Sequence, residues 1–406
     1  MKLLIKLAFR NILRNRRRTL ITGAVMTIGL AGLIFIDAFL MGLIDTMIHS
    51  ATSTFLADFQ IHREKGPQSS LDSTIAEYDA LADRLQKKSE QISFSPRIVT
   101  QGMVSAAEYS FHVRIYGVNV QAERKTSELL GNVVTGEVFT DELSEDPEVL
   151  IGERLALYLN VRLGDHLVLV SSGAAQSGMV QERFKIRGIF RSGTKKIDQY
   201  IVLMNHPTAK KFFHLKEKEY QEIALHTLDP KLRSEPSLFS LAVGSNEIQS
   251  WRQLIPALDA GITVTGFSRM VYSIILLFLT LLTVTNAVFM SIYERLYEMG
   301  VIKAIGTRSR SVFLLIMLES FFLSLLSAVM GVLLGSFLIF IFQKTGVPFG
   351  EVEFFGASIH QRIIPLFQAR QFYKYPFFII CVAQVAALYP AIYASRINPL
   401  LALRRE

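Results

Sequence analysis

The charged residues with the clearest chemical pattern lie in a short segment between two long apolar runs. Residues 291–310 read SIYERLYEMGVIKAIGTRSR. Glu294 and Glu298 are four residues apart, so a helix places both carboxylates on one face, while the apolar residues recur at helical spacing on another. Gly306 favours the end of a helix. The pattern predicts a short amphipathic helix that makes ionic and apolar contacts, and the alternative is an ordinary solvated loop.

Other candidate patterns for catalysis or ligand binding fail on residue order or spacing. GIFRSGTK at 188–195 has glycines at the spacing of a phosphate-binding loop, but Thr194 and Lys195 stand in the wrong order and the context is a strand. The eight histidines show no metal-ligand spacing, and no G-x-S-x-G or H-E-x-x-H motif occurs. We therefore expect no catalytic residue, no metal site and no cofactor on this chain, and Cys381 has no partner for a disulfide.

The composition indicates a membrane protein. Half of the 406 residues are hydrophobic, and mean hydropathy is +0.33. The net charge of +8 comes from short flanks: residues 1–18 carry seven basic and no acidic residues, whereas residues 37–269 carry 25 basic and 29 acidic ones. Under the positive-inside rule the basic flanks are cytoplasmic and the long acidic stretch is external, which disfavours nucleic-acid binding.

The apolar runs are each long enough to cross a bilayer as a helix, which takes roughly 20 residues. The expected fold is four transmembrane helices with a large α+β external domain inserted between the first two. The expected segments are an amphipathic basic interface helix at 1–18, a first transmembrane helix and stalk at 19–51, an external domain at 52–265, a second transmembrane helix at 266–293, a surface helix and loop at 291–310, a third transmembrane helix at 311–343, an external loop at 344–374, a fourth transmembrane helix at 375–395 and a cytoplasmic tail at 396–406.

Two features of the flanks refine this topology. In residues 1–18, Lys2, Lys6, Arg10 and Arg14 form a basic helical stripe suited to anionic lipid headgroups. A signal peptide is disfavoured because the apolar run that follows is too long and lacks a small-residue cleavage site. Asp37 lies about 27 Å along the helix axis from Arg18, which favours a residue at the membrane boundary over a buried relay.

The external domain should combine short helices with strands. We expect a helix around 75–88, strands at 112–120, 149–152 and 223–228, and a hairpin formed by 166–170 and 183–190. The small and polar residues 171–182 suit the loop of that hairpin. Residues 251–261 lead back to the membrane, and the second span should continue into the surface helix without a break.

The segment after the second span resembles a known family. ERLYEMGVIKAIGTRSRSVFLLIMLES is similar to the coupling-helix region of the MacB/FtsX-like permeases of ABC transporters. The residues of this region that we assign to ATPase coupling are Glu294, Arg295, Glu298, Gly300, Val301, Lys303, Ala304 and Gly306. LAFRNILRNRRRTLIT and ALYPAIYASRINPLLALRRE, with Pro390 and Pro399, also resemble the family's two ends.

The resemblance implies partners for this chain. The segment would dock on a separate ATPase, and two copies of that subunit would bind ATP and Mg, because no LSGGQ signature occurs here. A second permease subunit, identical or homologous, would complete the dimer. VLIGERLALYLNVRLGDHLVLV and FRSGTKKIDQYIVLM look like the periplasmic domain of the lipoprotein-releasing (LolC/LolE-type) branch. That branch implies a lipoprotein substrate and a periplasmic carrier; whether a carrier docks on the 171–182 hairpin stays open.

For the remaining candidate residues the sequence leaves two roles open. Glu319 joins the coupling helix to the bundle or is a protonated structural residue. Gly331 and Gly335 lie on a small-residue face that packs within the subunit or at a dimer interface. Four apolar residues near the outer end of span one line a substrate cavity or face lipid and the stalk: Phe35, Phe39, Leu40 and Leu43.

The combined expectation is a non-enzymatic inner-membrane permease subunit with cytoplasmic termini and a periplasmic domain. Its partner ATPase would drive extraction of lipoproteins towards a periplasmic carrier. The alternatives are FtsX-like signalling to a cell-wall hydrolase and MacB-like efflux of peptides or drugs with an adaptor and an outer-membrane channel. The sequence alone leaves the substrate, and the choice between homodimer and heterodimer, undecided.

Overall fold

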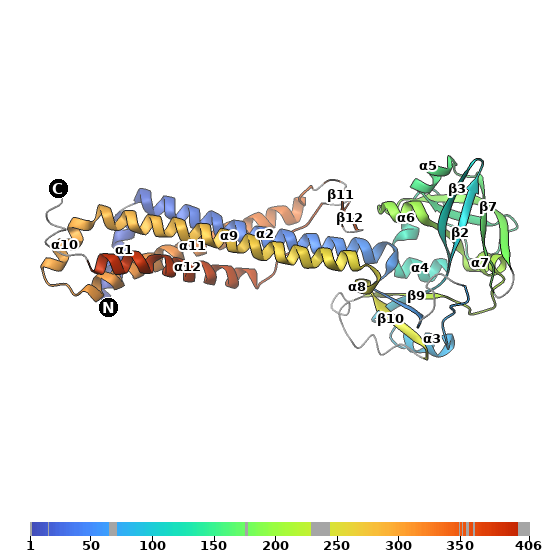
Figure 1. Cartoon of the computed structure of the whole chain (residues 1–406), viewed down its shortest axis with the longest axis horizontal. Helices are drawn as coiled ribbons and strands as arrows, with labels where there is room; N and C mark the ends of the chain where they lie inside the picture. Colours follow the sequence, from blue (N-terminus) through green and yellow to red (C-terminus); the bar gives the residue numbers. More distant parts are fainter. Residues whose placement is uncertain are drawn as a thin grey trace. The chain divides into compact units, whose positions relative to one another are not determined.

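The computed structural model describes residues 2–14, 16–64, 71–174, 178–228, 244–348, 350, 352–354, 357–359 and 362–396. The predicted tail beyond Arg396, with Pro399, and the centre of the 171–182 loop fall outside these residues. The chain divides into two units, which are described separately (Figure 1). The helical unit contains Met1–Ile44, Ile262–Pro348 and Arg362–Glu406, and the mixed unit contains Asp45–Gly261 and Phe349–Gln361.

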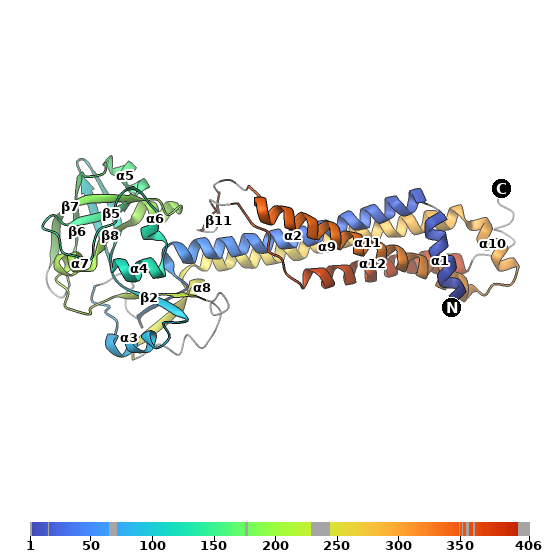
Figure 2. The same cartoon turned by 180° about the vertical axis from the view of Figure 1, so that it is seen from behind.

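The helical unit consists of long apolar helices and two short polar ones. Its elements are α1 (Lys2–Arg14), α2 (Arg16–Ala51, which continues into the mixed unit), α9 (Pro256–Glu294), α10 (Leu296–Ala304), α11 (Ser309–Thr345) and α12 (Gln371–Ser395). Within the described residues, the four long helices are each long and apolar enough to cross a membrane. Figure 2 shows α1 crossing the end of the bundle where α10 also lies. The prediction of four transmembrane helices is confirmed.

Small residues on α11 set how closely two of the spans approach. A Cβ added at Gly331 would lie 2.9 Å from Leu30 of α2, and one added at Gly335 would lie 3.2 Å from Ile34. Close backbone approach through small residues is a common way for membrane helices to pack, because lipid supplies no hydrophobic driving force between them. In this structure the small-residue face therefore packs against the chain's own α2. Leu30 and Ile34 belong to the buried core of the bundle.

Two details of the spans differ from the predictions. The second span does not run unbroken into the surface helix, because α9 ends at Glu294 and Arg295 has non-helical dihedral angles. The fourth span begins earlier than predicted, because α12 already starts at Gln371 rather than at residue 375. Asp37 is only 6% exposed, and its carboxylate lies 3.4 Å from the Arg269 guanidinium, while its position at the membrane boundary stays a prediction.

The mixed unit has the expected α+β composition. Its helices are η1 (Thr52–Leu56), α3 (Tyr78–Gln86), α4 (Val120–Thr126), η2 (Leu129–Gly131), α5 (Glu153–Leu159), α6 (Lys195–Tyr200), α7 (His206–Phe213) and α8 (Trp251–Leu254). Its strands are β1 (Phe59–Arg63), β2 (Ile92–Ala106), β3 (Tyr109–Val118), β4 (Val133–Gly136), β5 (Glu148–Gly152), β6 (His166–Ser172), β7 (Met179–Phe190), β8 (Ile201–Asn205), β9 (Glu222–Thr227), β10 (Asn246–Ser250), β11 (Val352–Phe354) and β12 (Ala357–Ile359). The predicted hairpin is present as β6 and β7.

The long strand β2 organises the sheet. Its first half pairs with β9 and its second half with β6 along one edge, while β3 pairs along the other edge. Because β6 also pairs with β7, strands β2, β3, β8, β5, β7 and β6 form a closed ring of pairings. Gly102 lies where β2 meets β6, and a Cβ there would be 2.6 Å from the Val170 carbonyl oxygen. The closed ring removes exposed strand edges, and β9, β1 and β10 extend the sheet from β2.

A buried arginine, Arg97, holds the first segment of the mixed unit against the sheet. Arg97 on β2 is fully buried and donates to Glu123 of α4 and Glu222 of β9, at 2.5 and 2.8 Å. It also donates to the backbone oxygen of Phe55 in η1 at 2.8 Å, and its guanidinium lies over the Phe55 ring. Burial acts to lower the pKa of Arg97, but the two glutamates outweigh it and raise that pKa. The residue therefore ties the end of the α2–η1 segment to the sheet.

Candidate functional site

The short helix α10 lies against the ends of three long helices. Its first residue follows the break at Arg295, and it ends before Gly306, whose φ of +98° suits glycine. Apolar residues of α9, α10, α11 and α12 pack together here in a small cluster: Ile292, Met299, Val312, Ile316, Ala391 and Ala394. The predicted surface helix is therefore part of the packed bundle rather than a solvated loop.

An ionic network, which we call the α10 joint, connects this helix to α1 and α11. It consists of Asn11, Arg14, Arg295, Glu298 and Glu319. Arg295 donates to Glu319 at 3.1 Å and to Glu298 at 3.2 Å, and the Asn11 amide donates to Glu319 at 2.5 Å. Arg14 donates to both carboxylate oxygens of Glu298. One arginine at the helix break thus connects carboxylates of two different helices.

The joint has a buried half and an exposed half. The Arg295 and Glu319 side chains are 9% and 14% exposed, whereas those of Arg14 and Glu298 are 52% and 44% exposed. Exposed pairs typically contribute about 0–1 kcal/mol, whereas removing one member of a buried pair costs several times more because it leaves a buried charge without its partner. Of the two ionic contacts, Arg295–Glu319 is therefore the one whose loss should cost more free energy.

The exposed half stabilises the ionised form of Glu298. Burial acts to raise the pKa of Glu298, but hydrogen bonds from Arg14 and Arg295 outweigh it, so the pKa lies below its ordinary value. The contacts of Glu298 with Arg14 and with Arg295 are therefore both ionic around neutral pH.

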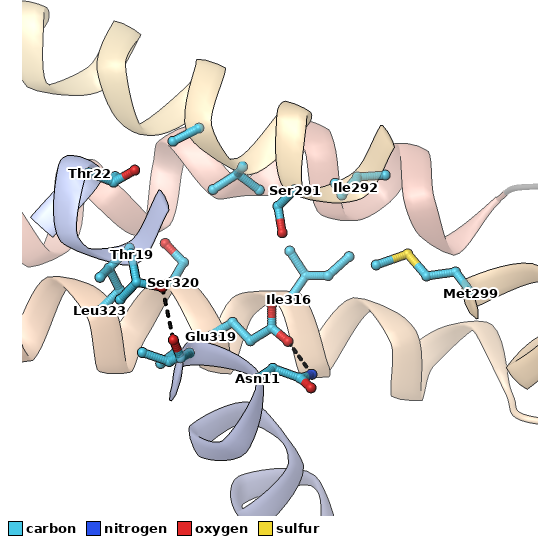
Figure 3. Close-up of a pocket in the computed structure, with 13 residues that line it drawn as sticks. Asn11, Thr19, Thr22, Ser291, Ile292, Met299, Ile316, Glu319, Ser320 and Leu323 are labelled. Carbon is cyan, nitrogen blue, oxygen red and sulfur yellow. Dashed lines mark hydrogen bonds between the residues drawn. The ribbon is translucent and has the colours of Figure 1, made fainter. Parts of the chain in front are cut away.

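A cavity of about 50 Å³ adjoins the joint (Figure 3). Glu319 and Asn11 point towards each other at its edge, and Ser291, Thr22 and Ser320 contribute hydroxyl groups to its lining. Most of its lining is apolar, but it is large enough for a water molecule, and these hydroxyl groups and Glu319 are polar partners that such a water needs.

The family-matched residues divide into inward-facing and outward-facing sets. Arg295 and Gly300 are buried, and Lys303 donates to the backbone oxygen of Ser395 at the end of α12 at 2.8 Å. Glu294, Ala304 and Gly306 are exposed, Val301 and Glu298 are half-buried. The exposed set lies beside large apolar side chains that are also exposed: Tyr297, Ile302 and Ile305. The inward residues hold α10, and the outward ones form a mixed polar and apolar face.

The four residues of span one that were predicted to line a substrate cavity are all half-buried. Phe35 packs against Phe342 of α11, with ring centroids 5.2 Å apart, and contacts the bundle core. Phe39, Leu40 and Leu43 are half-buried. The contacts of Phe35 favour helix packing at that position, and the substrate cavity stays a prediction. Within the described residues, no group of histidine, cysteine and acidic residues is arranged to hold a metal ion.

The sequence did not reveal two partners in the joint, Asn11 and Arg14, or the contact of Lys303 with Ser395. Asn11 and Glu319 are 308 residues apart, and Arg14 and Glu298 are 284 apart. Arg14 was assigned to a lipid-facing stripe, but its guanidinium binds Glu298 instead. Ser395 contributes only a backbone oxygen, which no side-chain pattern identifies. The only sequence signal for the Asn11–Arg14 pair was their three-residue spacing on one helical face.

The fold and this site define a class: a multi-pass membrane protein with a large domain inserted after its first span. Two family models match the chain: the MacB-like periplasmic core domain over residues 19–235 and the FtsX-like permease C-terminal over residues 270–399. The chain therefore belongs to the MacB/FtsX-like family of ABC transporter permeases.

Several relatives of this chain bear the name of the lipoprotein-releasing branch. A "Lipoprotein-releasing system transmembrane protein LolC" of Xylella fastidiosa (strain Temecula1 / ATCC 700964) is 22% identical over 305 residues, covering 71% of this chain and 72% of the relative. The protein of the same name from Neisseria meningitidis serogroup B is 20% identical over 364 residues, covering 83% of each. The resemblance to this branch expected from the sequence is thus found, at low identity.

Solved structures resemble the mixed unit only weakly. The periplasmic region of MacB from Actinobacillus actinomycetemcomitans has a TM-score of 0.34 and 14% identity, covering 52% of this chain and 95% of that one. The extracellular domain of the ABC-type transporter YknZ has a TM-score of 0.33 and 13% identity, covering 47% of this chain and 99% of that one. Scores this low carry no argument about function.

Proposed function

We propose that this ABC transporter permease couples ATP hydrolysis on a separate cytoplasmic subunit to motion of its mixed unit, and that the transported cargo is a lipoprotein of the inner membrane. The observation that carries the coupling proposal is the α10 joint. It presents an exposed face of α10 outward while Arg295 holds the same helix to Glu319 of α11. A force on the exposed face is therefore transmitted to a long span through a buried ion pair.

The docking partner of α10 would be an ABC ATPase. Two copies of it would bind ATP and Mg and supply the hydrolysis, with two permease subunits, identical or homologous, completing the transporter. The exposed Tyr297, Ile302 and Ile305 offer apolar contact, and Glu294 and Gly306 lie beside them. The termini would then be cytoplasmic and the mixed unit periplasmic, as the distribution of basic residues favours.

Motion would reach the mixed unit through continuous helices. α2 runs from Arg16 to Ala51, and α9 runs from Pro256 to Glu294, ending directly at the joint. An α-helix transmits a tilt along its length because its backbone hydrogen bonds keep it stiff. At the far end of α2, Arg97 binds the η1 backbone, so displacement of that segment would move the sheet with it.

The lipoprotein cargo rests on the LolC relatives and on the sequence resemblance. Their identities of 20–22% support the branch without fixing the substrate. In this proposal the acyl chains of a lipoprotein leave the membrane between two permease subunits and pass to a periplasmic carrier.

The test is affinity purification of the full chain from native membranes in mild detergent, followed by mass spectrometry. We expect an ABC ATPase and acylated lipoproteins. An ATPase with a cell-wall hydrolase, or with an adaptor and a channel, would keep the coupling proposal and overturn the cargo. Absence of any ATPase would overturn the coupling proposal itself.

A matched pair of variants locates the docking face. Ile305, the residue directly after α10, is 81% exposed, and Leu157 in the mixed unit is 73% exposed. Ile305→Asp should abolish recovery of the ATPase, whereas Leu157→Asp should leave it unchanged. Equal recovery with both variants would show that the ATPase docks elsewhere.

A further inference from the structure

A second polar site lies at the opposite end of the helical unit from the α10 joint. It is a pocket of about 90 Å³ between α2, α9 and α12. Asp37 of α2, Arg269 of α9, and Arg370, Gln371 and Lys374 at the start of α12 all line it. Arg269 is about 38 Å along the α9 axis from the end of that helix, so the pocket is separate from the coupling face.

The pocket holds an excess of positive charge. The Arg269 Nε lies 3.4 Å from Asp37 Oδ1, which offsets one of the three cations. In the part of the chain that the structure describes, neither Arg370 nor Lys374 has a carboxylate within ion-pair distance. The Lys374 ammonium lies 5.5 Å from the centre of the Tyr375 ring, a contact that leaves its charge uncompensated. The site therefore attracts an anion.

A buried amide in the same pocket also points to a ligand. Gln371 is only 2% exposed, and neither its side-chain nitrogen nor its side-chain oxygen has a hydrogen-bond partner among the described residues. A buried polar group without a hydrogen-bond partner is unfavourable, so a bound ligand that supplies one would stabilise the folded chain. Gln371 is also the first residue of the 25-residue helix α12, whose N-terminus carries the positive end of the helix dipole.

We propose that this pocket binds a phosphate group carried by a membrane phospholipid headgroup. Arg370 and Lys374 pair with its oxygens, the Gln371 amide donates to it, and Asp37 orients Arg269. Its place favours a lipid over a free ion, because α12 begins there as a candidate span. Tyr373 is 66% exposed, as expected for an aromatic residue at headgroup level.

The test measures thermal unfolding of the full-length chain, delipidated in neutral detergent, with three probes. These are dioctanoyl-phosphatidylglycerol, inorganic phosphate and uncharged dioctanoylglycerol. The phosphatidylglycerol should raise the unfolding temperature, and dioctanoylglycerol should not. Stabilisation by inorganic phosphate at the same concentrations would support the phosphate chemistry and assign the site to a free ion. Equal stabilisation by dioctanoylglycerol would overturn the proposal.

Variants distinguish binding of the lipid probe in the pocket from its attraction to surface charge in general. Lys374→Gln and Gln371→Glu should each weaken the apparent affinity for dioctanoyl-phosphatidylglycerol about tenfold, the loss expected for a charge-assisted hydrogen bond. Lys374→Arg keeps the charge and should retain binding. Lys344→Gln, at the exposed end of α11, removes an equal charge outside the pocket and should change the affinity less than twofold. An equal effect of Lys374→Gln and Lys344→Gln would overturn the assignment.

Discussion

Arg97 and Arg295 are each bound by two glutamates next to a helix end, but in very different surroundings. Arg97 is fully buried, and its partners Glu123 and Glu222 have side chains 1% and 5% exposed. Arg295 contacts one nearly buried carboxylate, Glu319, and one, Glu298, whose side chain is 44% exposed. The Arg97 network is rigid, whereas the α10 joint is partly open to water and to salt. The difference suits a fixed attachment in the mixed unit and an adjustable one at α10, where we propose that an ATPase docks.

The largest effect should follow from breaking the rigid network. Arg97→Met leaves two buried carboxylates without their cation, which should destabilise the mixed unit by about 3–5 kcal/mol. Thermal or chemical unfolding of the purified full chain measures this. Arg191→Gln breaks the exposed pair with Glu153 and should cost less than about 1 kcal/mol. Similar losses in both variants would remove the distinction between buried and exposed pairs.

Acid should weaken the mixed unit through His206. Burial lowers the pKa of this imidazole to about 4, although its hydrogen bond to the Pro96 carbonyl opposes the shift. Unfolded histidine binds a proton near pH 6.5, so this group's contribution to stability is present above that pH and is lost as pH falls towards 4. The unfolding temperature should fall more between pH 7.5 and pH 5 in the native chain than in His206→Gln. Parallel pH profiles would contradict this assignment.

Breaking the buried half of the α10 joint should reduce both coupling and the stability of the helical unit, because Glu319 loses its buried cation. Arg295→Gln leaves Glu319 without its cation while Asn11 still donates to it. We expect ATPase recovery with the chain to be unchanged and the permease-stimulated ATPase rate to fall about tenfold, within the range of typical coupling energies. Loss of ATPase recovery would instead make Arg295 part of the docking face.

The smallest effect on coupling should come from breaking the exposed half of the α10 joint, the Arg14–Glu298 pair. Arg14→Gln removes a contact that is open to solvent, so the stimulated ATPase rate should fall less than about threefold, and the difference should vanish in high salt. Measuring the rate at low and high ionic strength tests this. A loss that persists in high salt would mean that the Arg14–Glu298 pair acts as a buried contact.

Much of the fold could be predicted from the sequence because local patterns determine it. Uninterrupted apolar length specified the four spans, Gly306 marked the end of α10, and alternation identified β6 and β7. The dual pairing of β2 could not be predicted, since it depends on the register of distant strands. Arg97 looks like any strand arginine, and its burial depends on Glu123 and Glu222 arriving from other elements.

Part of the candidate site could also be predicted, again because local sequence patterns determine it. The segment 291–310 was recognisable because its residues are contiguous. Asn11 and Arg14 come from 284 or more residues away, and no glycine or proline marks the helix break at Arg295. The contact of Asp37 with Arg269 could not be predicted either, because the two residues lie on different helices.

The most direct test of the coupling account is a double-mutant cycle on the buried pair of the α10 joint. The stimulated ATPase rate would be measured in reconstituted transporters carrying Arg295→Gln, Glu319→Gln or both, with equal ATPase content confirmed in each. If the two residues act through each other, the double variant should lose no more activity than Arg295→Gln alone. Losses that multiply would show independent roles, and would contradict transmission through this ion pair.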